Sequence, residues 1–298
     1  MKGEKFNFDI GVRVEQADGF IQRETGVGSN TFQKGQVSAT GIAVAAAALY
    51  KISQNTNVYA NGSRGYFFPE LRGVRFSSPG VPQSYEPEEV IQGELGAKLN
   101  LGNFAATGAV YFVALNDRRS VDFVNLPSGG VAEEVALQST RTIGAEVNLN
   151  YQIISGVNLY GNATFQNAQF TQFEGNDELV GKTPRRQPGV MAMVGVNVRR
   201  GNFDFDVSNN FLGSKFANDA NTVELGAYNI VRSTIGYRIE LGNNESLRIG
   251  LSAFNLLNDA GVTEGSPRQG NAQISGGEFF VGRPILPRRI FLRLAFDF

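Results

Sequence analysis

The amino-acid sequence predicts an all-β protein, an antiparallel transmembrane β-barrel of about twelve strands with short periplasmic turns and long extracellular loops. Three observations predict this class. Apolar and polar residues alternate along most of the chain, as expected for strands with two different faces. The alternating segments run about 10 to 16 residues, whereas about 9–11 residues are enough to cross a bilayer at a tilt. Short and long connections also alternate, which places every long connection at the same end of the strands.

The first half of the chain contains five alternating segments. Residues 6–15, FNFDIGVRVE, set one face with the apolar side chains Phe6, Phe8, Ile10, Val12 and Val14. Residues 41–52, GIAVAAAALYKI, are ambiguous, because alanine favours a helix while Ile42, Val44 and the flanking pattern favour a strand. The other three segments begin near Val58, Gly93 and Phe104.

The second half contains seven alternating segments. Residues 142–152, TIGAEVNLNYQ, and 231–241, VRSTIGYRIEL, alternate over their whole length. The other five begin near Val157, Val190, Phe203, Leu247 and Ile290. The sequence therefore predicts about twelve strands and no helix.

The connections distinguish a membrane barrel from a soluble sandwich. Short connections rich in glycine and asparagine, which suit tight hairpins, follow Ile52 and precede Phe104, Val157, Phe203 and Leu247. Long polar connections span residues 18–35, 66–89, 120–140, 171–187, 213–226 and 259–283. A soluble sandwich has no reason to gather its long loops at one end. The polar faces also carry too many charges for a dry core, so we expect the apolar faces to contact lipid and the polar faces to line a wet lumen.

The composition excludes most enzyme chemistry. The 298 residues include no cysteine and no histidine, so a disulfide, a thiolate or imidazole metal site and a histidine base are impossible. Acidic clusters fall in the long connections and are expected to be solvated loop charges; they are Glu86, Glu88 and Glu89, Glu133 and Glu134, and Asp177 and Glu178. A net charge of −1 gives no reason to expect a nucleic-acid partner. We therefore expect no enzyme activity, no catalytic residue, no metal and no cofactor.

The last segment has a wholly apolar face, formed by Ile290, Leu292, Leu294, Phe296 and Phe298. A terminal strand of this kind that ends in phenylalanine resembles the sorting signal that the barrel-assembly machinery reads in bacterial outer-membrane barrels. The resemblance implies that Phe296 and Phe298 form a C-terminal assembly signal.

Five motifs resemble, in the same order, those of TonB-dependent outer-membrane receptors. They are Ser63-Arg64-Gly65-Tyr66 followed by Pro69-Glu70-Leu71; Glu94-Leu95-Gly96 with Lys98; Gly144 with Glu146; Asn255 to Asn258; and Pro284, Pro287 and Arg288 ahead of Phe298. The motifs cover nearly the whole chain, and the closing strand is most similar to that of receptors from Bacteroidetes-type bacteria.

The resemblance implies a location, a role and partners. Residues 1–298 would form the C-terminal portion of a receptor barrel of about twenty-two strands, in the bacterial outer membrane, without the signal peptide, TonB box and plug that precede the barrel. The segment MKGEKFNFDI indeed lacks the apolar core of a signal peptide. The implied role is energy-coupled uptake of a large nutrient such as a siderophore, glycan or peptide. The implied partners are outer-membrane lipid, lipopolysaccharide, the barrel-assembly machinery and, only through the missing plug, TonB.

Two alternatives stay open on the sequence alone. About twelve strands could close on themselves into a smaller barrel that acts as a passive pore or an adhesin, and closure would remove two unpaired edges. A soluble secreted β-domain is the second alternative, and it would dissolve without detergent.

Arginines near the ends of the strands are the candidate ligand contacts: Arg64, Arg72, Arg118, Arg119, Arg185 and Arg186. All fall at transitions from strand to extracellular loop. Guanidinium groups can hold the carboxylate or phosphate of a ligand, or the phosphates of lipopolysaccharide. Solvation of the rim and contact with lipid headgroups is the alternative role.

Overall fold

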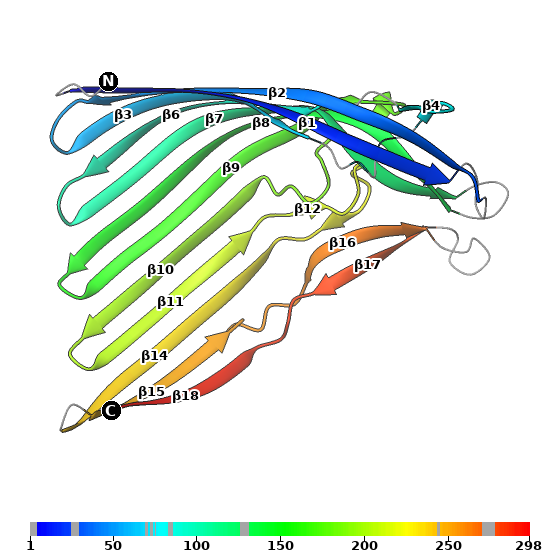
Figure 1. The fold of residues 1–298 in the computed structure, drawn as a ribbon. Helices are drawn as coiled ribbons and strands as arrows, with labels where there is room; N and C mark the ends of the chain where they lie inside the picture. The colour runs from blue at the N-terminus through cyan, green and yellow to red at the C-terminus, as the bar shows by residue number, and fades with distance from the viewer. Residues whose placement is uncertain are drawn as a thin grey trace.

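One antiparallel sheet of twelve strands forms most of the molecule (Figure 1). The computed structural model describes residues 5–24, 30–68, 71, 74, 76–82, 86–125, 131–242, 245–269 and 278–298. In pairing order the strands are β1 (Phe6–Glu24), β2 (Phe32–Lys51), β3 (Thr56–Phe67), β6 (Glu88–Asn100), β7 (Phe104–Asn125), β8 (Val131–Ile154), β9 (Val157–Phe173), β10 (Val190–Arg200), β11 (Phe203–Leu212), β14 (Tyr228–Gly242), β15 (Glu245–Phe254) and β18 (Arg289–Asp297).

The sheet is open. Its order begins at β1 and ends at β18, which lie at opposite edges in Figure 1. The predicted all-β fold and the twelve antiparallel strands are confirmed, and the ambiguous residues 41–52 fall almost entirely within β2. Within the described residues, no helix is long and apolar enough to cross a membrane.

Short turns and long loops lie at opposite ends of the strands, as predicted (Figure 1). Four of the tight turns contain a glycine with positive φ, where a side chain would be strained; these are Gly102, Gly156, Gly201 and Gly242. The long connections hold small hairpins and a 3₁₀ turn: β4 (Phe76–Ser78) with β5 (Val81–Pro82), β12 (Lys215–Phe216) with β13 (Glu224–Leu225), β16 (Val262–Gln269) with β17 (Glu278–Pro284), and η2 (Asp177–Leu179).

Two of the predicted loops are largely strand. The β1–β2 pair continues to Glu24 and Phe32, and the β7–β8 pair continues to Asn125 and Val131. Much of the predicted loops 18–35 and 120–140 is therefore a strand pair that projects beyond the membrane. Polar residues predominate in these segments, so their sequence resembles that of a loop although the backbone is paired as strands.

The two faces of the sheet differ in polarity as predicted. Residues directly opposite in an antiparallel pair share a face, so Glu94 shares one with Asn61 and with Tyr111. On the other face large apolar side chains are bare: Val12 is 69% exposed and Leu292 is 67% exposed. In an outer membrane this second face meets lipid, and burial in the bilayer replaces the core that a soluble protein would need.

Buried apolar clusters lie at the loop end of the molecule. One joins Ile21, Val37 and Val74, and another joins Phe170, Phe173 and Leu179. Leu179 belongs to η2 and contacts the end of β9. The twelve-stranded sheet is a single layer. In the described part of the chain, apolar side chains therefore pack together mainly where loops fold over the strand ends.

Candidate functional site

The polar face carries a tyrosine set over a glycine of the adjacent strand. Tyr59 of β3 lies opposite Gly96 of β6, and a Cβ added to Gly96 would lie 2.5 Å from the Tyr59 hydroxyl oxygen. The Tyr59 hydroxyl bonds Glu94, and the Lys98 ammonium lies 5.1 Å from the centre of the ring. The Glu-Leu-Gly-x-Lys motif thus forms a cradle: the glycine makes room for the ring, and the two charged residues contact it.

The same arrangement occurs twice more along the polar face. Tyr111 lies opposite Gly144 and its hydroxyl donates to the side chain of Gln166 at 3.2 Å. Tyr160 lies opposite Gly195 and its hydroxyl donates to the Asp206 carboxylate at 2.9 Å. Tyr111 and Tyr160 each span three consecutive strands, whereas Tyr59 spans β3 and β6, so the polar face is cross-linked by side chains as well as by the backbone.

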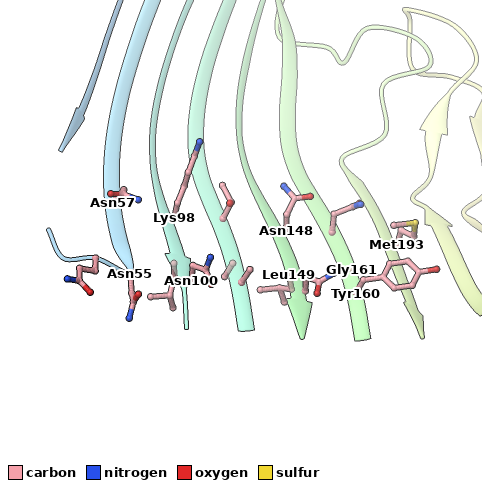
Figure 2. Close-up of a pocket in the computed structure, with 16 residues that line it drawn as sticks. Asn55, Asn57, Lys98, Asn100, Asn148, Leu149, Tyr160, Gly161 and Met193 are labelled. Atoms are coloured by element: carbon pink, nitrogen blue, oxygen red, sulfur yellow. The ribbon is translucent and has the colours of Figure 1, made fainter. Parts of the chain in front are cut away.

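A shallow hollow of about 580 Å³ occupies the polar face close to the short turns (Figure 2). Amide side chains dominate its lining, including Asn57, Asn148 and Asn162, and Lys98 extends along it. Asparagine offers both donors and acceptors without charge. This end of the lumen can therefore exchange hydrogen bonds with a neutral polar surface, and its amides were absent from the predicted site.

Arg64 and the acidic cluster at residues 86–89 come together at the extracellular end of β3 and β6. The Arg64 guanidinium bonds and ion-pairs with Glu89, which also accepts a hydrogen bond from the Asn116 amide at 3.3 Å. Glu88 accepts the Arg119 backbone N–H at 3.0 Å. Two carboxylates predicted as solvated loop charges are thus bonded within the rim.

The second arginine pair follows a bulge in β7. Asp117 has φ 55°, and the register with β8 shifts between Leu115 and Arg118. The bulge leaves Arg118 exposed and Arg119 half-buried. Arg72 lies outside the described residues, as do the side chains of Glu133 and Glu134, whose backbone belongs to β8.

The third arginine pair joins loops that are far apart in sequence. Arg185 ion-pairs with Asp219 at 3.5 Å and its backbone N–H donates to the same carboxylate at 2.7 Å. Arg186 lies 2.9 Å from the Glu264 carboxylate and also donates to Ser266. These contacts connect the β9–β10 loop to the β11–β14 loop and to β16.

Asn255, the first residue of the asparagine-leucine motif, is completely buried and adopts φ 52°. Its amide donates to the backbone oxygens of Asp259 at 2.9 Å and Leu286 at 3.0 Å, and its side-chain oxygen accepts the Asp259 N–H at 2.9 Å. Asn258 accepts the Arg288 N–H at 2.9 Å. The motif therefore ties the end of β15 to the segment that leads into β18.

A partly open pocket of about 240 Å³ lies among the loops that Arg185 and Arg186 connect. Thr183, Gln187, Ser214 and Lys215 are among its lining residues. Lys215 belongs to β12, beyond the end of the membrane-spanning strand. Burial lowers the pKa of its ammonium from the ordinary 10.5, with Glu264 opposing and Arg186 reinforcing that effect. Sequence reasoning missed this residue, because a single lysine in a polar connection carries no motif.

The remaining predicted positions are exposed or unclustered. The Phe296 and Phe298 rings stack at 6.0 Å, and Phe298 is 97% exposed; their role as an assembly signal stays a prediction. Asp177 and Glu178 form the first turn of η2. In the part of the chain that the structure describes, no three acidic side chains come together as a metal site.

Known proteins share this fold. Residues 2–256 match the family described as "TonB dependent receptor-like, beta-barrel". The ferric yersiniabactin uptake receptor FyuA from Yersinia pestis has a TM-score of 0.76 at 16% identity, with 99% of this chain and 44% of that chain covered. BauA, the ferric preacinetobactin receptor from Acinetobacter baumannii, has a TM-score of 0.68 at 22% identity, with coverage of 99% and 40%.

The ferric citrate transporter FecA has a TM-score of 0.70 at 18% identity, with 97% of this chain and 42% of that chain covered. This chain therefore spans less than half the length of each of the three proteins. Their sequence identity is low, so they show likeness of fold, whereas the family match extends over most of the chain. The chain belongs to the TonB-dependent receptor-like β-barrel family of the bacterial outer membrane.

Proposed function

We propose that this chain is the C-terminal portion of the barrel of an energy-coupled outer-membrane receptor that takes up a large nutrient. The observation that carries the proposal is the open sheet. Nearly the whole chain superposes on less than half of FyuA, BauA and FecA, and the sheet ends on two edge strands, β1 and β18. Edge strands of this length call for pairing partners, and further barrel strands of the same receptor would supply them.

The cargo and partners follow from the same proposal. Ferric chelates are named for FyuA, BauA and FecA, so a ferric siderophore is the first cargo to test, ahead of a glycan or a peptide. TonB would act through a plug supplied by another part of the receptor. Lipopolysaccharide would surround the extracellular rim, where the six predicted arginines would meet it or the cargo. The barrel-assembly machinery would recognise Phe296 and Phe298.

Cysteine cross-linking tests the proposal against the small self-closed barrel. The chain has no native cysteine, so engineered pairs report without background. Val12→Cys with Val44→Cys is the positive control, because these residues lie opposite each other on β1 and β2. A disulfide requires Cα atoms within about 7 Å. We expect the control pair to oxidise, and pairs that combine Val12→Cys with cysteines scanned over 290–296 to stay reduced.

The contrary result is equally clear. An intramolecular disulfide between β1 and β18 in the membrane-inserted chain would show that the twelve strands close on themselves. The passive pore or adhesin would then replace the receptor proposal.

A further inference from the structure

The pocket among the loops is lined by β9 and by two connections, β9–β10 and β11–β14, which specific bonds hold together. Asn221 accepts the Thr183 N–H at 2.9 Å and donates to the Thr183 oxygen at 2.7 Å. The Arg186 N–H donates to the Phe216 oxygen at 2.8 Å. These bonds fix the positions of two lining residues, Thr183 and Phe216. The pocket is therefore preorganised, which reduces the cost of ordering side chains on binding.

Positive charge is in excess beside the pocket. The Glu264 carboxylate is shared by two arginines, Arg186 at 2.9 Å and Arg283 at 3.4 Å. Lys215 adds a third cation close enough to both Glu264 and Arg186 to be influenced by them. Glu224, the other charged lining residue, is not among the groups that influence the Lys215 ammonium.

The Lys215 ammonium keeps donor capacity for a ligand. Its recorded contact among the described residues is with the Tyr228 ring, whose centre lies 5.9 Å away. In the described part of the chain it has no carboxylate within ion-pair distance. The pKa of Lys215 is lowered mainly by burial, which outweighs the opposing influence of Glu264, as expected for an ammonium that has lost water without gaining a carboxylate in direct contact.

We propose that this pocket is a subsite for an anionic group, a carboxylate or a phosphate on a solute that enters from the extracellular side, and that Lys215 is the residue that pairs with it. The Thr183 and Ser214 hydroxyls and the Gln187 amide line the same pocket and supply neutral donors beside the ammonium. The proposal rests on the receptor function for the origin of the solute, whereas the binding site itself rests on the pocket.

Equilibrium dialysis of the full chain in detergent tests the subsite with radiolabelled phosphate and citrate as probes. We expect both anions to bind at millimolar concentration or below. Lys215→Gln should weaken binding about tenfold, because a hydrogen bond to a charged group is lost, and Lys215→Arg should largely restore it. Lys34→Gln is the matched control, since it removes the same charge from an exposed position on β2, outside the pocket.

Three results would overturn the subsite. The first is that neither phosphate nor citrate binds the native chain. The second is that Lys215→Gln binds the anions as tightly as the native chain does. The third is that Lys34→Gln weakens anion binding as much as Lys215→Gln does. Binding of lipopolysaccharide micelles that depends on Lys215, without binding of either small anion, would overturn the assignment to a solute. None of these results concerns the pairing of β1 with β18, so the receptor proposal is judged separately by the cross-linking experiment.

Discussion

At Gly144, the space that a side chain would occupy is filled by the ring of Tyr111 from the adjacent strand. A Cβ there would overlap the Tyr111 ring and lie 2.8 Å from the Phe165 carbonyl oxygen. The ring can move, but the backbone oxygen belongs to the adjacent strand and cannot do so cheaply. The glycine therefore allows the tyrosine to cross its strand and reach Gln166.

We expect Gly144→Ala to destabilise the protein by about 1–3 kcal/mol, the usual cost of overpacking. Urea unfolding of the folded protein in detergent, followed by its heat-modifiable migration, measures the change. Gly108→Ala is the control, because its nearest atom, the Glu146 oxygen, would lie at 3.7 Å. Equal midpoints for the two variants would contradict the cross-strand role of Tyr111.

Side-chain contacts between strands can be predicted only when the pairing register of the strands is known. Alternation places Tyr59 and Tyr160 among the polar residues of their strands, but it does not say which residue of the next strand lies opposite. Gly96 and Gly144 belong to the motifs found in the sequence, but their role in making room for a tyrosine ring is visible only once the strand pairing is known. Lys215 had no such signal, because its environment is made by loops more than 25 residues apart.

At the scale of elements, junctions between strands and loops hold the strongest side-chain bonding. Asn255 lies where β15 ends and satisfies backbone groups of two segments. Asp259, four residues on, accepts the Asn229 N–H at 2.8 Å. One short motif therefore fixes the relative positions of β14, β15 and the entry to β18.

Asn255→Ala should lower the free energy of unfolding by on the order of 3 kcal/mol, because buried backbone groups lose partners and alanine lacks the side-chain amide that lets asparagine adopt a positive φ. Chemical denaturation in detergent measures it. Asn103→Ala, in an exposed short turn, should change stability by less than about 0.5 kcal/mol. A similar small effect at Asn255 would refute its role as the anchor of the junction.

The Arg186–Glu264 pair should couple the β9–β10 loop to β16. Both side chains are partly exposed, at 42% and 30%, so we expect a double-mutant coupling of only about 0.5–1 kcal/mol that weakens at high salt. Thermal unfolding of Arg186→Met, Glu264→Gln and the double variant measures it. Arg13 and Glu15, at 71% and 43% exposure, provide the comparison pair and should show coupling near zero. Equal coupling in the two pairs would contradict a special role for the loop bridge.

At the scale of the whole molecule, periodicity was the reliable guide. Strand number, face polarity and the alternation of turns with loops follow from a repeat of two residues, which the lipid on one side and water on the other impose along every spanning strand. Outside the bilayer that asymmetry ends. The projecting parts of β1–β2 and β7–β8 and the small hairpins β4–β5, β12–β13 and β16–β17 were missed there, since polar residues predominate and the side chains that cover one face, such as Val74 over Ile21 and Val37, come from distant loops.

The order of the strands has a consequence for how such a wall is made. Each strand of the sheet pairs with the sheet strands nearest to it along the chain. Forming contacts between strands that are close in sequence costs little loop-closure entropy. This low contact order favours growth of the sheet by one hairpin at a time. During such growth only the newest edge strand is unpaired at the growing side, and evolution can lengthen or shorten the wall by whole hairpins without disturbing the ones already in place.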